Sequence, residues 1–256
     1  MYIAYFALHY GADFLAWSIR SIQNAVDEIH ILYTPYPSFG QSTDLICPET
    51  EEQLKKEAYR FLAQGKPLFW HTGRWSNEGS HRNTILQIAK DRNARLILVV
   101  DADELWDPDT AAKALIDSET YHSEAHIIRA RFIHFWRSLH WACEDPSLPA
   151  RIINPWVKQE KEWYISPQEY PVLHFGYAQN IEITKYKQDI HGHKNEWRQG
   201  WFENKFKAWH PGSDIIDVHP TCHQDFWHPR PTPPKVKELV DKLLYDHPWY
   251  GKDLIV

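Results

Sequence analysis

The sequence has few cysteines, no long apolar run and no excess of positive charge. Its three cysteines lie far apart without a Cys-x-x-Cys pair, which argues against a disulfide framework and favours a reducing compartment. No run approaches about 18 apolar residues and the first residues carry no basic segment, so we expect neither a membrane span nor a signal peptide. A net charge of −6 excludes the global basic field of a non-specific nucleic-acid binder. We therefore expect a soluble, cytoplasmic protein.

The composition is otherwise that of a globular protein, with many aromatic rings. Over 256 residues, 43% hydrophobic and 24% charged residues suffice for the core of one large domain. The 13 Trp and 16 His are less usual, because these side chains offer flat faces with a polar tip that suit grooves for sugars or bases. A large core rich in aromatics explains them equally well.

Strands and helices alternate along the first half of the chain. Apolar runs and helical periodicities predict strands at 2–8, 28–33, 67–71 and 96–100, and helices from 13, at 50–65, at 80–93 and from 107. This alternation predicts an α/β fold with a mostly parallel central sheet flanked by helices. Ligands of such sheets bind beyond the carboxyl ends of the strands.

The pattern changes after about residue 124. We expect a longer strand at 125–136, short strands at 151–153 and 172–175, helices at 181–190 and 195–209, an extended proline-rich connector at 227–234 and a last amphipathic helix. We predict a single domain over residues 1–256, in which 1–124 bind the nucleotide sugar and the His- and Trp-rich 125–256 bind the acceptor.

A cluster of carboxylates follows the most apolar expected strand. In ILVVDADELW, residues 97–106, five apolar residues lead directly into Asp101, Asp103 and Glu104. Carboxylates this close raise one another's pKa unless a cation joins them. Mg²⁺ or Mn²⁺ binds one or two carboxylates and completes its shell with water and phosphate oxygens. A short D-x-D also occurs in ordinary surface loops, but its place at the end of a buried strand favours a metal site.

Two other classes of enzyme that contain such a carboxylate cluster are disfavoured. A haloacid-dehalogenase-like phosphatase has its nucleophilic Asp on an early strand in a DxDx(T/V) setting, whereas position 105 is Leu and the motif lies far into this chain. A P-loop ATPase requires a GxxxxGK(S/T) stretch, which does not occur.

Three segments together resemble nucleotide-sugar glycosyltransferases of the GT-A fold, close to family 2. They are the opening FALHYGADFLAWSIRSIQNAVDEIHIL, the helix and strand in EGSHRNTILQIAKDRNARLILVVDADE, and the DxD within VVDADEL, which resembles the metal-binding motif of the family. The resemblance covers about residues 1–110. The opening departs from the family pattern, because residues 9–13, HYGAD, replace the more usual Asn-Glu.

The resemblance implies a GT-A (Rossmann-like) fold and a hexosyltransferase-type enzyme. It would move a sugar from a nucleotide diphosphate sugar, most often UDP, to an acceptor hydroxyl with Mn²⁺ or Mg²⁺. Asp103 would bind the metal, and Asp101 would contact the ribose or the metal. Arg82, for which a solvated helix position is the alternative, would reach the ribose or the diphosphate. The implied nucleotide-binding set is Ala7, Leu8, His9, Thr34, Arg82, Asn83, Asp101 and Ala102.

The second half would supply a metal-binding histidine and a base. Such enzymes often complete the metal shell with a C-terminal His; His223 and His219 are the first candidates, and His174 and His228 are the others. An inverting reaction needs a carboxylate that takes the acceptor proton. Glu144 and Asp145 are the first choices and Asp225 the second. A retaining reaction would need none of them.

The acceptor is predicted to be a glycan or glycolipid, with a hydroxylated base in DNA as a minority alternative. The DNA alternative depends on KNEWRQGWFENKFKAWH, residues 194–210, which combines basic and aromatic residues but also fits an amphipathic helix that packs its rings inward. Two other functions stay open: a metal-dependent nucleotidyltransferase or phosphohydrolase, and a non-catalytic nucleotide-sugar-binding module.

Overall fold

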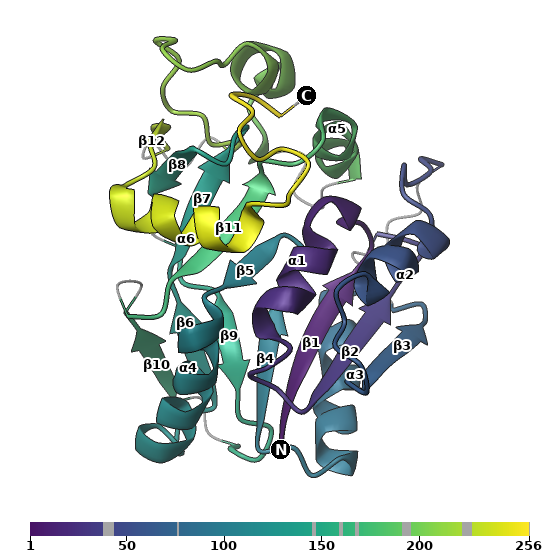
Figure 1. Ribbon diagram of the computed structural model, residues 1–256. Helices are drawn as coiled ribbons and strands as arrows, with labels where there is room; N and C mark the ends of the chain where they lie inside the picture. The colour runs from purple at the N-terminus through teal and green to yellow at the C-terminus, as the bar shows by residue number, and fades with distance from the viewer. Residues whose placement is uncertain are drawn as a thin grey trace.

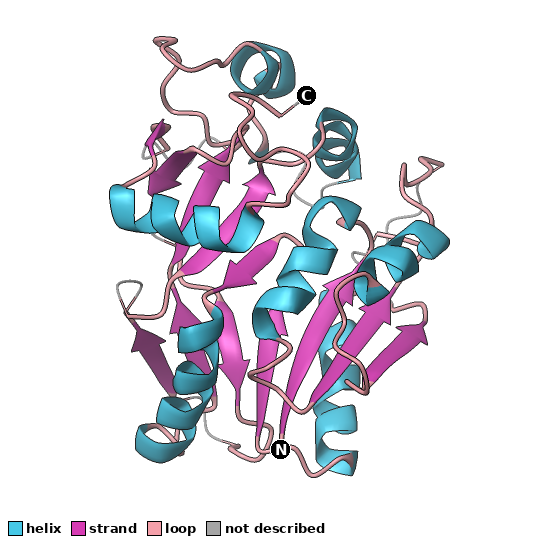
Figure 2. Cartoon of the chain, in the orientation of Figure 1, coloured by secondary structure: helices cyan, strands magenta, loops and turns pink. Residues whose placement is uncertain are grey.

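The chain forms an α/β fold with two sheets (Figures 1 and 2), seen in a computed structural model. The structure describes residues 1–37, 44–75, 77–144, 147–158, 161–166, 169–190, 196–221 and 227–255. Among these residues, no helix combines the length and apolar character needed to span a bilayer.

The first half alternates strands and helices as expected. Its elements are β1 (Tyr2–Leu8), α1 (Ala12–Ile22), β2 (Glu28–Tyr33), α2 (Glu51–Tyr59), β3 (Leu68–Thr72), α3 (Glu78–Asp91), β4 (Leu96–Val100), the short β5 (Glu104–Trp106) and α4 (Pro108–Tyr121). β1 pairs in parallel with β2 and β4, and β2 with β3. The expected mostly parallel sheet is therefore confirmed.

Local sequence signals explain where three of these helices begin. Thr50 and Gln53 form the capping box at the start of α2, and Asp107 caps α4 ahead of a proline in its first turn. Helix α3 begins earlier than expected, because Asn77 is its N-cap. The Asn77 side chain accepts from the Ser80 backbone N–H, and the Ser80 hydroxyl accepts from the Asn77 backbone N–H.

The second half adds short strands to both sheets. Its elements are β6 (Ile127–Ala130), β7 (Phe132–Trp136), β8 (Trp141–Glu144), β9 (Ala150–Ile153), β10 (Glu162–Ile165), β11 (Val172–Tyr177), α5 (Ile181–Ile190), the π-helix η2 (Phe202–Lys207), β12 (Arg230–Pro231) and α6 (Pro234–Leu244). Among the described residues, the larger sheet has the order β10-β6-β9-β4-β1-β2-β3, and the smaller sheet β12-β8-β7-β11-β5.

Two expected elements differ from the structure. Residues 125–136 form two strands in different sheets instead of one long strand, because the chain leaves the larger sheet at the exposed Arg131. The helix expected at 195–209 is reduced in the described part to a segment around η2. Gly200 has φ +68, a left-handed conformation that interrupts a helix, and Trp197 instead bridges to Thr221.

The core explains the uniformly apolar strand β4. All five of its residues are buried; Leu98 and Val100 pack in the cluster formed with α1, α2 and α4, and Ile97 and Val99 in the cluster formed with α3. The smaller sheet has its own core, in which Leu243 and Leu244 of α6 cover β7 and β11 (Figure 1).

The strand order defines where a ligand would bind. The chain passes from β1 through α1 to β2 and then to β3 on one side, and it returns through α3 to β4 on the other side of β1. The carboxyl ends of β1 and β4 therefore form a topological switch point, which is where open α/β sheets bind ligands.

Candidate active site

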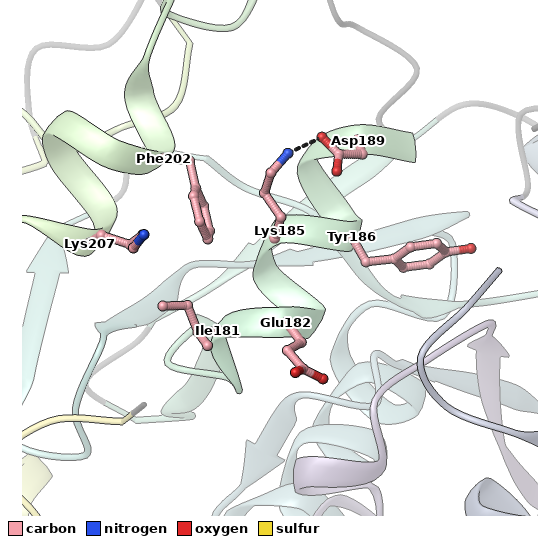
Figure 3. Close-up of a pocket in the computed structure, with 7 residues that line it drawn as sticks. All are labelled: Ile181, Glu182, Lys185, Tyr186, Asp189, Phe202 and Lys207. Atoms are coloured by element: carbon pink, nitrogen blue, oxygen red, sulfur yellow. Dashed lines mark hydrogen bonds and ion pairs between the residues drawn. The ribbon is translucent and has the colours of Figure 1, made fainter. Parts of the chain in front are cut away.

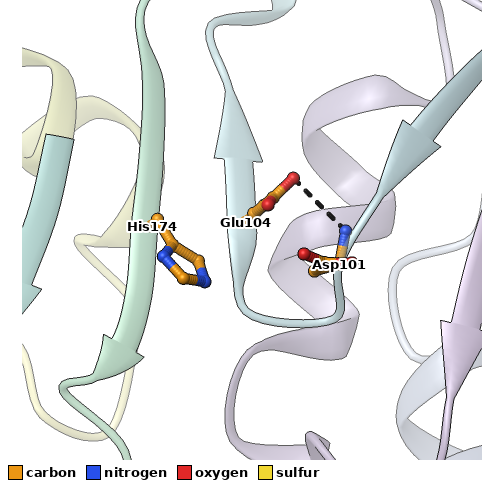
Figure 4. Close-up of side chains that lie close together, drawn as sticks. All are labelled: Asp101, Glu104 and His174. Atoms are coloured by element: carbon orange, nitrogen blue, oxygen red, sulfur yellow. Dashed lines mark hydrogen bonds between the residues drawn. The ribbon is translucent and has the colours of Figure 1, made fainter. Parts of the chain in front are cut away.

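The carboxylate cluster lies at this switch point and joins the two sheets. Asp101 follows β4 in the larger sheet, and three residues later β5 begins at the edge of the smaller one. Strand β11 pairs with β5 so that His174 lies opposite Glu104, and it pairs with β7 so that His174 also lies opposite His134. Figure 4 shows Asp101, Glu104 and His174 turned toward one another across this junction.

Gly11 allows the loop after β1 to touch the carboxylate loop. Its φ is +131, and a Cβ built there would lie 2.5 Å from the Cβ of Ala102. The Glu49 carboxylate accepts hydrogen bonds from the backbone N–H groups of Gly11 at 2.6 Å and Ala12 at 3.1 Å, at the N-terminus of α1. The two loops at the switch point are thus fixed against each other.

Replacing Gly11 with alanine is expected to lower the free energy of unfolding by at least about 2 kcal/mol, since strained backbone and overpacking each cost about 1–3 kcal/mol. Urea denaturation measures the loss. The matched control is Gly65→Ala, because Gly65 has φ +80 but nothing within 4 Å of the added Cβ. Equal losses in the two variants would contradict a close contact with Ala102.

A buried arginine holds two of the carboxylates. Arg151, whose side chain is 6% exposed, donates from Nη2 to Asp101 Oδ2 at 2.7 Å and also to Glu104, which is fully buried. Burial raises the pKa of Glu104 well above its usual value, and Arg151 opposes this shift. Partial burial also works against ionisation of Asp101, yet Arg151 holds the pKa of Asp101 below its usual value. Arg151 is therefore an internal counter-ion of the cluster.

Asp103 faces a different set of partners. Its carboxylate accepts a hydrogen bond from Gln179 Nε2, and its Oδ1 lies 3.4 Å from His174 Nε2. Lys187 Nζ lies 4.0 Å from Asp103 Oδ2. Burial alone would raise the pKa of Asp103, but His174 and Lys187 lower it below its usual range. Asp103 is thus a buried carboxylate held in its ionised form.

His134 supports His174 from behind. The Nδ1 atoms of His134 and His174 lie 2.9 Å apart, and His134 is 5% exposed. On its other side the His134 ring packs against Trp227 at 4.6 Å, and Trp227 in turn contacts the ring of His219 at 4.5 Å. A hydrogen bond to one imidazole nitrogen orients the other nitrogen toward a ligand.

Replacing His134 with phenylalanine is expected to weaken Mn²⁺ binding about 10–100-fold, because His174 loses the partner that orients its ring. Isothermal titration with Mn²⁺ measures the change. His219→Ala, tested in the same way, separates the two histidines. We expect the Mn²⁺ affinity of His219→Ala to equal that of the unaltered chain. Weaker Mn²⁺ binding in His219→Ala but not in His134→Phe would contradict the role of His134 in orienting His174.

The cluster could hold a divalent cation. Among the described residues, Asp101, Glu104 and His174 each offer one ligand atom, and these atoms all lie within 4.8 Å of one another. Oxygen-rich sites of this kind suit Mg²⁺ or Mn²⁺. The Asp101 side chain is 43% exposed, whereas Glu104 is fully buried. Solvent, and hence a substrate oxygen, can therefore reach the cluster at Asp101.

The expected nucleotide-binding residues of β1 and β2 lie together at the same edge. His9 Nδ1 is 2.8 Å from the backbone oxygen of Thr34, and His9 Nε2 is 2.8 Å from the hydroxyl of Tyr186 in α5. Ala7 is exposed, whereas Leu8 is buried in the core. Their contact with a nucleotide stays a prediction.

The other expected residues lie elsewhere or outside the described ranges. Arg82 and Asn83 are exposed on α3, and the neighbouring His81 is the side chain that is buried, with Nε2 3.0 Å from the Leu32 oxygen. His219 packs on Trp227, so His174, and not His219, lies among the carboxylates. Outside the described residues lie His223, Asp225, Asp145 and the side chain of Glu144.

Four residues of this site were not found from the sequence. They are His134, Arg151, Gln179 and Lys187. An arginine inside the short apolar strand ARII was a usable signal, because a charge at such a place requires a buried partner. We find no comparable signal for the other three.

A cavity of about 370 Å³ lies between α5 and η2 (Figure 3). Lys185 and Lys207 both lie near the ring of Phe202, at 5.7 Å and 5.9 Å from its centroid, and Lys185 is paired with Asp189. Tyr186, which holds His9, is also on its wall. The cavity therefore adjoins the helix that carries Lys187.

The comparisons with known proteins give only a distant likeness. No family model and no curated protein matches the sequence. Among solved structures, the chain has a match to S. aureus TarS, a GT-A glycosyltransferase of family 2. The structure of TarS 1-349 has 14% identity and a TM-score of 0.42, covering 74% of this chain and 64% of that chain.

Two further TarS structures match over less of their length. The complex of TarS 1-349 with UDP has 16% identity and a TM-score of 0.34, and the match covers 53% of this chain and 36% of that chain. Another TarS structure has 13% identity and a TM-score of 0.39, and the match covers 68% of this chain and 37% of that chain. The chain thus spans less than two thirds of each TarS chain. Structural similarity at these TM-scores does not identify a function, so the function is inferred from the residues of this chain.

Proposed function

We propose that this protein is a metal-dependent glycosyltransferase of GT-A-like fold, which moves a sugar from a UDP-sugar to an acceptor hydroxyl. One observation carries the proposal: Asp101, Glu104 and His174 converge at the switch point between β1 and β4. The resemblance of residues 1–110 to nucleotide-sugar glycosyltransferases supports a nucleotide diphosphate, and UDP in particular, as the leaving group.

The proposed metal ligands are Asp101 and His174 of this group, together with Asp103, which is not one of the three residues within 4.8 Å of one another but lies next to His174. Asp101 reaches solvent, and Asp103 and His174 face each other at 3.4 Å. Glu104 stays behind them at the buried side of the cluster, where it pairs with Arg151. When bound, Mg²⁺ or Mn²⁺ would neutralise the charge on the departing diphosphate. Asp101 and His174 would orient the ion toward the phosphate oxygens.

Lys187 is the proposed second cation for the diphosphate. Its ammonium group donates to the backbone oxygen of Gly176 at 3.2 Å and lies 4.0 Å from Asp103. A lysine has three N–H donors, so two are left for a phosphate group among the described residues. Its side chain is 19% exposed and is therefore partly desolvated, which strengthens its interaction with an anion.

Replacing Lys187 with alanine is expected to weaken UDP binding about 10–100-fold while uridine binding stays unchanged, because a cation beside a diphosphate contributes about 1.5–3 kcal/mol. Calorimetric titration with both ligands in the presence of Mn²⁺ measures this. Lys185→Ala is the matched control, since Lys185 lies on the same helix but is paired with Asp189. Equal weakening in both variants would point to a general surface-charge effect.

The reaction itself is tested by turnover of a panel of UDP-, GDP- and ADP-sugars with and without Mn²⁺. We expect Mn²⁺-dependent release of UDP from one UDP-sugar. If no nucleotide sugar is bound or hydrolysed with any metal, the proposal fails. Release of phosphate or pyrophosphate without sugar transfer would support the phosphohydrolase or nucleotidyltransferase alternative. UDP binding without turnover would support a binding module.

The acceptor is proposed to be a glycan or glycolipid. The aromatic residues of the stretch that suggested DNA, among them Trp201, Phe202, Phe206 and Trp209, are buried in one core cluster, and this favours inward packing over a base-stacking surface. For an inverting reaction, Glu144, Asp145 and Asp225 stay the proposed bases that take the proton of the acceptor hydroxyl.

A further inference from the structure

A cavity of about 460 Å³ lies between the first turn of α1, helix α2 and the segment that follows α6. Neither Asp101 nor Asp103 lines it. Its volume is in the range of pockets that enclose small molecules, about 300–1,000 Å³. It is therefore large enough for a ligand of its own, apart from the carboxylate cluster.

One wall of the cavity includes Trp249, whose ring packs against the rings of Phe14 at 5.6 Å and His247 at 5.2 Å between centroids. His247 Nδ1 accepts from the Trp249 backbone N–H at 3.2 Å, and His247 Nε2 donates to the Asp13 backbone oxygen at 2.9 Å. Burial lowers the pKa of His247 to about 4, so the ring stays neutral and keeps this tautomer. The His247 ring also stacks on Phe14 at 4.6 Å. Trp249 thus offers a half-buried aromatic face that is already in place.

Polar groups on the other walls have hydrogen-bonding capacity to spare. Asp13 Oδ2 accepts from the Asn180 N–H at 2.8 Å, and within the described residues its Oδ1 has no hydrogen-bond partner. Asn180 Oδ1 accepts from the Glu182 N–H, which leaves the Asn180 Nδ2 donor unused among the described residues. Lys56 lines the cavity and is exposed. One acceptor and two kinds of donor therefore belong to residues that line the same cavity.

The charges around the cavity are balanced. Arg60 pairs with Glu57 at 3.1 Å and its guanidinium lies over the ring of Trp17 at 4.9 Å. Of the two remaining ionisable groups, Lys56 is a cation, and Asp13 carries only part of a negative charge at neutral pH because burial raises its pKa to about 7. Among the lining residues a phosphate or a polyanion would find only Lys56 to balance its charge, since Arg60 is paired with Glu57, so an uncharged ligand with many hydroxyl groups fits better.

We propose that this cavity is a carbohydrate-binding site, which takes one neutral sugar unit stacked on Trp249 and hydrogen-bonded by Asp13, Asn180 and Lys56. An aromatic face together with a carboxylate, an amide and an ammonium group matches the apolar ring face and the hydroxyls of a pyranose. The site goes beyond the proposed function and does not depend on it, because the sugar is bound here and not transformed.

The site is physically linked to the carboxylate cluster. Gln179 donates to Asp103, and the next residue, Asn180, donates its backbone N–H to Asp13. Two consecutive residues ahead of α5 therefore connect the two places. A glycan held in the cavity lies beside the segment that positions Asp103.

Saturation-transfer NMR on the full chain tests the proposal, without metal or nucleotide. The probes are the α- and β-methyl glycosides of glucose, galactose, mannose and N-acetylglucosamine at millimolar concentration. We expect a signal from at least one probe. Trp249→Ala should weaken its binding about tenfold through loss of the stacking face. Lys56→Ala, an exposed substitution that leaves folding intact, should weaken it about threefold to tenfold.

Two variants serve as controls. Trp156→Ala removes another indole, 50% exposed, outside the cavity, and should bind like the unaltered chain. Asp103→Asn should also bind normally, because the sugar is not at the carboxylate cluster. The proposal is overturned if no probe binds or if Trp249→Ala binds as well as the unaltered chain. It is also overturned if Asp103→Asn loses the signal while Trp249→Ala keeps it.

Discussion

Replacing Arg151 with methionine is expected to lower the free energy of unfolding by about 3–5 kcal/mol at neutral pH. The guanidinium is the counter-ion of both Asp101 and the fully buried Glu104. Methionine fills a similar volume and can keep the contact with Phe132, over whose ring the Arg151 guanidinium lies at 4.7 Å. The loss of unfolding free energy therefore measures the effect of a carboxylate without its counter-ion and not the effect of a cavity. Urea denaturation followed by circular dichroism measures it.

The pH dependence of this loss identifies Glu104 as the cause. Burial raises the pKa of Glu104 above its unfolded value of about 4.3, and replacing Arg151 removes the cation that opposes this shift. A group with a raised folded-state pKa contributes stability below its unfolded pKa, and this contribution is lost as the pH rises toward the folded pKa. The variant should therefore lose more stability at pH 8 than at pH 5, relative to the unaltered chain.

Two further variants test whether the missing counter-ion causes the loss. Arg129→Met breaks a partly exposed pair with Glu162 and should cost less than about 1 kcal/mol. Adding Glu104→Gln to Arg151→Met should recover a large part of the stability, because it removes the buried charge. A loss at Arg151 that is independent of pH, or that the second substitution does not reduce, would contradict the role of counter-ion.

Replacing Asp103 with asparagine is expected to lower Mn²⁺-dependent turnover of the UDP-sugar about 100–1,000-fold. A proposed metal ligand loses its charge, and several kcal/mol of transition-state stabilisation depend on the bound ion. The measurement is kcat/KM for release of UDP at saturating and limiting Mn²⁺. Turnover that equals that of the unaltered chain at every Mn²⁺ concentration would exclude Asp103 from the metal site.

Asparagine keeps the hydrogen bond that Asp103 makes inside the protein. Its side-chain oxygen can still accept from Gln179 Nε2, so the melting temperature should change by only a few degrees. Asp117→Asn is a suitable control, because this carboxylate pairs with Lys113 on the surface and lies outside the cluster. We expect it to leave turnover unchanged. A large drop in that variant would mean that general charge, and not the cluster, determines turnover.

Much of the first half of the fold could be predicted because its signals are local. The uniformly apolar run that became β4 requires cover on both faces, and Thr50 with Gln53 marks the start of α2 within four residues. The acidic cluster after β4 was located for the same reason.

The rest of the site depends on contacts between distant parts of the chain. Asp101 meets Arg151 across 50 positions, and Asp103 meets Gln179 across 76. No local pattern distinguishes His174 from the other histidines as the one opposite Glu104, because this depends on the pairing of β11 with β5. The division of residues 125–136 into two strands at Arg131 is not predictable for a related reason. The pattern of these residues indicates extended structure but not that the chain passes from one sheet to the other.

The short connection between β4 and β5 makes the two sheets thermodynamically dependent on each other. Only residues 101–103 separate a central strand of one sheet from an edge strand of the other, and the candidate metal ligands come from both sides of this junction. A cation bound there adds its binding free energy to the folded state of both sheets at once. The ion would therefore couple their unfolding into one cooperative transition, so that its affinity and the melting of either sheet change together.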